Sequence, residues 1–143
     1  VKNSTMAQVI GIGGSFIKFK DPSKMREWYS SVLGMTTNEY GVLFEFNGDT
    51  DPKKGYLQLG TFEDSTDYFG ASNQQAMLNF RVDNMDDFKN QLIEAKVKIV
   101  DEIESYSYGK FLHIEDPEGN RIELWEAVDK EFEDSKDPKM AMK

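Results

Sequence analysis

The clearest pattern in the chain is an alternation of apolar and polar residues on either side of a turn-forming segment. Residues 112–115 and 121–124 alternate as half-buried strands do, and residues 116–120, Asp-Pro-Glu-Gly-Asn, are of the types that tight turns require. This pattern predicts a β-hairpin. A slip of one residue would place apolar side chains opposite polar ones, so the register is set. The expected pairs are Leu112 with Leu124, Ile114 with Ile122, His113 with Glu123, Phe111 with Trp125 and Glu115 with Arg121.

Two successive strand-helix-strand-strand-strand patterns cover most of the chain. The first comprises a strand at 9–20, a helix from Asp21-Pro22 to Gly34, and strands at 35–40, 42–46 and 55–62. The second comprises a strand at 77–82, a helix capped by Asn84, a strand at 97–103 and the hairpin. Helical spacing predicts that apolar side chains of the first helix face inward: Met25, Trp28, Tyr29, Val32 and Leu33.

The two patterns are related as a tandem repeat. Lys18-Phe19-Lys20-Asp21 matches Arg81-Val82-Asp83-Asn84, and Leu57-Gln58-Leu59 matches Ile122-Glu123-Leu124. A polar connection, residues 63–75, joins the repeats and carries Tyr68 and Phe69. We therefore expect an α+β fold of two tandem βαβββ modules, about 9–62 and about 76–128, which form a curved sheet around a cleft with helices outside.

The domain organisation follows from the same pattern. The 143 residues are 38% hydrophobic and 13% aromatic, which is enough for one core. We expect a leader at 1–8, a single domain at 9–128 and a charged C-terminal tail, helical or solvated, at 129–143.

Charge and composition narrow the classes of partner. With 17 basic and 26 acidic residues the net charge is −9, which disfavours binding to nucleic acid or to an anionic membrane. Cysteine is absent, and no signal peptide or membrane span is recognisable. We expect a cytoplasmic protein with a neutral or cationic small-molecule ligand.

Residues 116–126, Asp-Pro-Glu-Gly-Asn-Arg-Ile-Glu-Leu-Trp-Glu, resemble the closing hairpin of the glyoxalase / bleomycin-resistance / extradiol-dioxygenase superfamily, also called vicinal oxygen chelate proteins. The loop with Tyr68 and Phe69, together with residues 77–82, resembles an uncharacterised glyoxalase-like branch. The resemblance covers about residues 9–128. It implies the glyoxalase-like fold, with the site in the cleft.

The resemblance also implies where metal ligands would stand. Counting back from the two helix starts gives Gly14 and Met77, and the closing strands give Gln58 and Glu123. Glycine and methionine are unsuited to such a site, and a 2-His-1-carboxylate iron centre needs two histidines where the chain has one. We expect no cofactor and no dioxygenase activity. A divalent metal stays open as an alternative, with Glu123 as the best single candidate ligand.

The candidate catalytic residues are His113 and Glu123, as a general base or a two-point polar anchor. The alternative is a cross-strand polar pair that satisfies only itself. Ligand-binding candidates in the cleft, for which core packing is the alternative, are Gln58, Phe44, Phe46, Tyr56, Phe111 and Trp125.

Three functions are compatible with these features. The first is a glyoxalase-like protein that binds a small organic molecule in the cleft, with lyase or isomerase chemistry of the glyoxalase I type open. The second, implied by the bleomycin-resistance members, is metal-free sequestration of a cationic aromatic drug or toxin. The third is a regulatory or scaffold module with an unused cleft. Unpaired strand edges and an apolar sheet border predict a homodimer.

Overall fold

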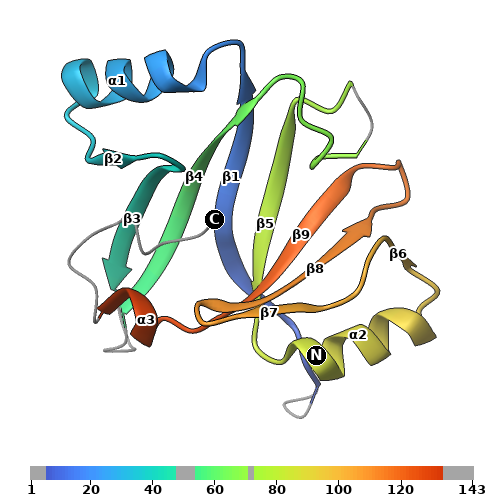
Figure 1. The fold of residues 1–143 in the computed structure, drawn as a ribbon. Helices are drawn as coiled ribbons and strands as arrows, with labels where there is room; N and C mark the ends of the chain where they lie inside the picture. Colours follow the sequence, from blue (N-terminus) through green and yellow to red (C-terminus); the bar gives the residue numbers. More distant parts are fainter. Residues whose placement is uncertain (1–5, 48–53, 71–72, 134–143) are drawn as a thin grey trace.

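The computed structural model describes residues 6–47, 54–70 and 73–133. The elements in chain order are β1 (Val9–Phe19), α1 (Pro22–Leu33), β2 (Thr37–Asn38), β3 (Gly41–Asn47), β4 (Lys54–Glu63), β5 (Ala76–Val82), α2 (Met85–Glu94), β6 (Lys98–Ile99), β7 (Glu104–Tyr106), β8 (Gly109–Glu115), β9 (Arg121–Ala127) and α3 (Lys130–Glu133) (Figure 1). None of the described helices has the length and hydropathy to cross a membrane.

The strands form one mixed sheet of nine strands. Their order is β2-β3-β4-β1-β5-β9-β8-β6, and β7 pairs with β8. β1 is parallel to β4, as β5 is parallel to β9, and the antiparallel pair of β1 with β5 joins the two halves. The sheet curves, and its two ends face each other across the front of the molecule in Figure 1. The predicted α+β fold of two βαβββ modules is confirmed.

The hairpin of β8 and β9 has the predicted register. Leu112 pairs with Leu124, and His113 pairs with Glu123. The leucines pack beneath α2 with Val82, Met85 and Leu92, whereas His113 and Glu123 leave the opposite face, toward the concave side. Alternation in the sequence therefore separates a core face from a site face.

Two predicted strands are shorter than expected. The strand predicted at 35–40 is only Thr37–Asn38, because the Asn38 side chain accepts from the N–H groups of Tyr40 and Gly41, at 2.8 and 3.2 Å, and bends the chain. The strand predicted at 97–103 ends at Ile99, and β7 follows it as a separate strand. Just after Ile99 the His113 N–H donates to Asp101 Oδ1 at 2.8 Å. The Asp101 side chain thus takes the place of the backbone carbonyl that would continue the strand pair.

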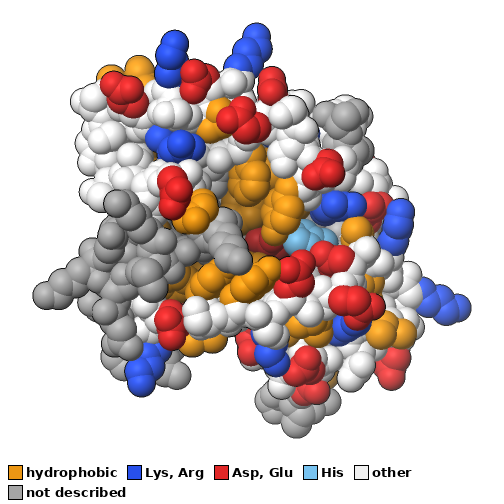
Figure 2. All heavy atoms as spheres, viewed as in Figure 1, with side chains coloured by type: hydrophobic (Ala, Val, Ile, Leu, Met, Phe, Trp, Pro, Cys, Tyr) orange, Lys and Arg blue, Asp and Glu red, His pale blue; other side chains and the backbone are white. Residues whose placement is uncertain are grey.

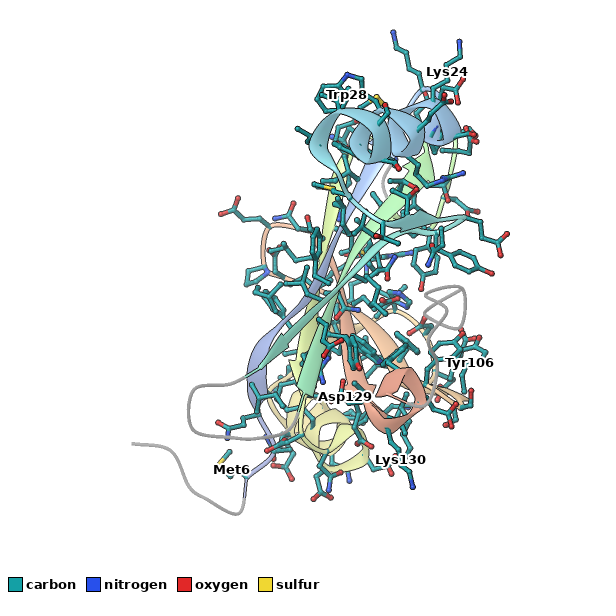
Figure 3. All side chains as sticks on the ribbon, turned by 90° about the vertical axis from the view of Figure 1, so that its left-hand side faces the viewer. Met6, Lys24, Trp28, Tyr106, Asp129 and Lys130 are labelled. Atoms are coloured by element: carbon teal, nitrogen blue, oxygen red, sulfur yellow. The ribbon has the colours of Figure 1, made fainter. Side chains whose placement is uncertain are left out.

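The helix α1 has the predicted ends but not the predicted packing. α1 has the predicted ends, with Asp21 capping the Lys24 N–H at 3.1 Å and Gly34 in the left-handed conformation at φ 72°. The prediction that Trp28, Val32 and Leu33 face inward is wrong, because α1 lies on the sheet through other side chains and these three are 47%, 59% and 52% exposed. Trp28 projects away from the sheet in Figure 3.

An aromatic cluster fills one end of the concave face. Phe132 of α3 lies 5.0 Å from the Tyr56 ring and 5.9 Å from the Trp125 ring, centroid to centroid, and is itself buried. The stretch expected to be a charged tail thus begins with a helix whose aromatic side chain packs between the two modules. The other end of the described chain is also held, because Ala7 and the Gln91 side chain exchange two hydrogen bonds of 2.9 and 3.0 Å.

Candidate functional site

A cavity of about 340 Å³ opens on the concave face, where both modules contribute side chains. Figure 2 shows the single histidine at the bottom of this hollow, between hydrophobic and acidic side chains. The residues that line it are Phe16, Phe62, Thr66, Tyr68, Glu104, Tyr106, Tyr108, Phe111, His113 and Glu123.

Glu123 of β9 is the buried anionic centre of this cavity, with 1% of its surface exposed. Its Oε1 accepts from Asn79 Nδ2 at 2.6 Å, and its Oε2 accepts from His113 Nε2 at 2.8 Å and from the Tyr68 hydroxyl. Asn79 reaches Glu123 because the two residues are neighbours in the parallel pair of β5 and β9. Three donors on one buried carboxylate stabilise its negative charge.

His113 of β8 lies between two carboxylates. Its Nδ1 is 2.7 Å from Asp101 Oδ2, on the side opposite Glu123. The protonated ring donates at both nitrogens and fits both partners. Burial lowers the pKa of His113, but the hydrogen bonds and charges of Glu123 and Asp101 outweigh it, so the net shift is upward. The site is thus a hydrogen-bonded chain of Asp101, His113 and Glu123, with the imidazole ring between the two carboxyl groups.

Tyr68 closes the inner end of the cavity from the connection between the modules. Its ring stacks on Phe62 at 5.6 Å and 9°, and meets His113 edge-on at 5.0 Å and 83°. Burial, followed by the charge of Glu123 and the hydrogen bond to it, raises the pKa of the Tyr68 phenol. Tyr68 therefore stays protonated and acts as a donor to Glu123.

Further aromatic rings form the outer wall. Tyr106 and Tyr108 stack at 5.2 Å and 4°, and the edge of Phe111 meets Tyr108 at 5.8 Å. The Tyr106 hydroxyl donates to Glu104, and this hydrogen bond is the main reason that the pKa of Tyr106 rises to about 12. The wall thus presents ring faces and a second carboxylate.

The structure brings together only some of the predicted site residues. Glu123, His113 and Phe111 line the cavity. Tyr56 and Trp125 belong to the buried aromatic cluster with Phe132, and Gln58 lines a smaller neighbouring cavity.

Two predicted residues do not contribute described side chains to the cleft. Phe44 pairs with Leu57, so strand alternation places it on the face opposite Gln58, where it is 40% exposed. The Phe46 side chain lies outside the described residues.

Sequence reasoning missed Asn79, Tyr68 and Asp101 as members of the site. Gly14 pairs with Gln58, and Asn79 pairs with Glu123, so the counterpart of Gly14 is Asn79 and not Met77. The signal that could have identified Asn79 is its pairing with Glu123 in the neighbouring parallel strands β5 and β9. No local pattern distinguishes Tyr68 or Asp101, because both reach the site through tertiary contacts.

The donor atoms do not fit a transition metal. Gly14 offers no side chain, and Glu123 and His113 already use their polar atoms on each other and on neighbours. The buried oxygens without a hydrogen-bond partner, Gln58 Oε1 and Asn79 Oδ1, are neutral amide oxygens, which transition metals bind less well than imidazole, thiolate or carboxylate. In the described part of the chain no group of three or more His, Cys, Asp or Glu side chains could hold a metal ion. The family resemblance implied Glu123 as the best candidate metal ligand, and the surroundings of Glu123 do not support that role.

The fold and the concave site define the class of this protein. The family model described as a glyoxalase-like domain matches residues 13–129, and the chain belongs to this family. This finding confirms the resemblance to the glyoxalase / bleomycin-resistance / dioxygenase superfamily. A search of curated proteins finds no match.

Solved structures with the same fold include two epimerases and a superfamily member. Methylmalonyl-CoA epimerase from Streptomyces coelicolor, in complex with 2-nitronate-propionyl-CoA, has 15% identity and a TM-score of 0.62, with 85% of this chain and 99% of that chain covered. The Mycobacterium tuberculosis epimerase has 19% identity and a TM-score of 0.56, with 90% and 95% covered. A glyoxalase/bleomycin resistance protein/dioxygenase superfamily member from Vibrio splendidus has 14% identity and a TM-score of 0.50, with 85% and 99% covered. At these identities the similarity shows the fold alone.

Proposed function

We propose that this protein binds a small aromatic molecule with a cationic or hydrogen-bond-donating group in the concave cavity, without a metal. One observation carries the proposal: six aromatic side chains surround a cavity whose polar residues include Glu104 and Glu123. Ring faces attract both flat apolar groups and cations, and the carboxylates favour a positive charge. The net charge of −9 supports the same class of ligand.

Glu123 is the proposed polar anchor of the ligand. Two of its donors, Asn79 and His113, stand on strands, whereas Tyr68 stands on the connection between the modules. An incoming N–H or O–H group can replace the Tyr68 phenol with little change in the sheet, because only a connecting segment has to move. The phenol on Glu123 thus occupies the place where the ligand's donor binds.

Proton transfer is a second candidate function. The chain of Asp101, His113 and Glu123 favours it, because a proton can be held at His113 Nε2 and passed to Glu123 Oε2 across 2.8 Å. This arrangement suits an isomerase or lyase that moves a proton next to a carbonyl group. Binding is the first candidate because the aromatic walls and the Glu123 carboxylate are sufficient for it, whereas the reaction also requires Glu123 Oε2 to take up a proton while it accepts from His113.

A thermal-shift titration tests the proposal. Benzylamine and related aryl-alkylamines are added to the wild type with EDTA, or with Mg²⁺, Mn²⁺, Ni²⁺ or Zn²⁺. At about 100 times the Kd a ligand stabilises by about 2.7 kcal/mol, which raises Tm by several degrees. We expect this rise in EDTA, and we expect Glu123→Gln to abolish it.

The matched control is Glu94→Gln, which removes one charge from the exposed surface of α2 and leaves the rise unchanged. A rise that occurs only with a divalent metal would contradict metal-free binding. Wash-in of solvent deuterium next to the carbonyl of an added ketone, lost in His113→Gln, would support the proton-transfer function instead.

A further inference from the structure

A second, smaller cavity lies beside the first in the N-terminal module. Its volume is about 100 Å³, and Phe16 and Phe62 line both cavities. These two rings contact each other at 5.2 Å, and a side chain at Gly60 would collide with both of them. Glycine at this position therefore lets the rings settle against β4, where they line the border that the two cavities share. The lining residues are Phe16, Glu39, Tyr40, Gln58, Gly60, Thr61 and Phe62.

The polar group of this cavity is the side-chain amide of Gln58, which is 2% exposed. Its Nε2 faces the carbonyl oxygens of Tyr40 and Leu59, at 3.5 and 3.4 Å. The reversed amide would bring Oε1 against the same two oxygens, so this orientation is the favourable one. Gln58 Oε1 is then buried without a hydrogen-bond partner in the described part of the chain.

A buried carbonyl oxygen without a donor is costly, so the cavity in front of it is suited to a group that donates. Among the described residues that line the cavity, Glu39 carries the one charge, and it is negative. The buried Lys18, which pairs with Phe62, places its Nζ over the Phe69 ring, 5.4 Å from the ring centroid. Glu39 is exposed and lines the cavity, whereas Arg26 donates to Thr61 from α1, on the sheet face that alternation places opposite Gln58.

We propose that this cavity is a subsite for a primary ammonium group, which donates to Gln58 Oε1 and lies near the Glu39 carboxylate. The aromatic part of the same ligand occupies the larger cavity, and its arm passes along Phe16 and Phe62, which line both cavities. A volume of about 100 Å³ accepts an ammonium group with one or two carbons, since a water molecule in the liquid takes about 30 Å³. This inference rests on the proposed function and names the ligand as a hydroxylated arylalkylamine, whose ring hydroxyl donates to Glu123 while its ammonium group lies at Gln58.

Calorimetric titration with two matched probes tests the subsite. Tyramine and 4-ethylphenol share the phenol ring and the two-carbon arm, and differ in the amino group. In the wild type we expect tyramine to bind at least tenfold more tightly. Gln58→Leu should bring tyramine down to the affinity of 4-ethylphenol and leave 4-ethylphenol unchanged. Gln75→Leu makes the same change at an exposed position and should alter neither affinity.

A second readout needs no variant. The side-chain amide resonances of Gln58 should shift when tyramine is added to the wild type, and should not shift with 4-ethylphenol. Equal affinity of the two probes would overturn the subsite and leave the proposed function intact. Tighter binding of tyramine without a Gln58 shift would also overturn it, because the amine would then lie at Glu104 or Glu123. Failure of both probes to bind would overturn both proposals.

Discussion

At the scale of single residues, the charge on His113 links the stability of the fold to pH. The imidazolium donates to Asp101 and Glu123, and its pKa in the folded protein lies above the ordinary value of 6.5. A folded pKa above the unfolded one gives stabilisation that is complete below the unfolded pKa and is lost as pH rises through the folded pKa. The protein should therefore be more stable near pH 6 than near pH 9.

Urea unfolding across this range measures the effect. His113 is the only histidine in the chain, so His113→Gln should remove most of the fall in unfolding free energy. A wild type whose stability does not change over this range, or a variant that keeps the full slope, would contradict the assignment of the proton to His113.

Removal of the Tyr68 hydroxyl tests whether a bound ligand takes the place of this group at Glu123. Tyr68→Phe keeps the ring on Phe62 and removes one donor from a buried carboxylate, so unfolding free energy should fall by about 1.5–3 kcal/mol. Affinity for benzylamine should rise, because the ligand no longer has to displace the phenol from Glu123. The rise should be about tenfold for each 1.4 kcal/mol that the phenol–Glu123 hydrogen bond contributes in the wild type.

Chemical denaturation and calorimetry give the two values for Tyr68→Phe. Tyr106→Phe is the matched control, because it removes a tyrosine hydroxyl from Glu104 at the partly exposed wall and should change stability little. Weaker binding of benzylamine to Tyr68→Phe would show that the phenol assists the ligand and does not compete with it.

Sequence alone predicted the His113 and Glu123 pair because strand alternation and a short turn act over a few residues. It missed Asn79 because counting back from the helix starts assumes equal strand lengths. β1 continues to Phe19, well past Gly14, whereas β5 ends at Val82, soon after Asn79. Only the pairing of whole strands reveals which residue stands beside Glu123.

At the scale of elements, α3 fixes one end of the cleft through a single side chain. Phe132→Ala should lower the unfolding free energy by about 3–5 kcal/mol, because it leaves a cavity between Tyr56 and Trp125. Lys130→Ala, on the same helix but exposed, should stay within about 0.5 kcal/mol of the wild type. Equal effects of the two substitutions in urea unfolding would show that α3 does not hold the modules together.

The helices also show what periodicity predicts and what it does not. The capping residues Asp21 and Gly34 fixed the ends of α1, since capping is a local interaction. Periodicity groups Trp28, Val32 and Leu33 on one stripe, but it carries no information about what covers that stripe. In the described chain α1 leaves these side chains largely exposed.

At the scale of the whole molecule, this apolar stripe supports the expected homodimer. Large exposed apolar side chains grouped on one helix are typical of an interface. Sedimentation should give a species of twice the 16.4 kDa chain mass, and Trp28→Glu with Val32→Glu should convert it to a monomer. Glu94→Lys, a substitution at an exposed position of α2, serves as the control for altered charge. A wild type that sediments at the chain mass at high concentration would contradict the dimer.

The central position of β1 has a consequence for how the chain folds. β1 precedes the other described strands in the chain, yet it pairs with β4 of its own module and with β5 of the other. During synthesis the edge of β1 that β5 covers stays open until residues 76–82 have left the ribosome, so we expect the first half of the chain to be prone to aggregation at that stage. Once β5 is in place, separation of β1 from β5 would expose the paired edges of both modules together. We therefore expect the two modules to unfold in a single transition.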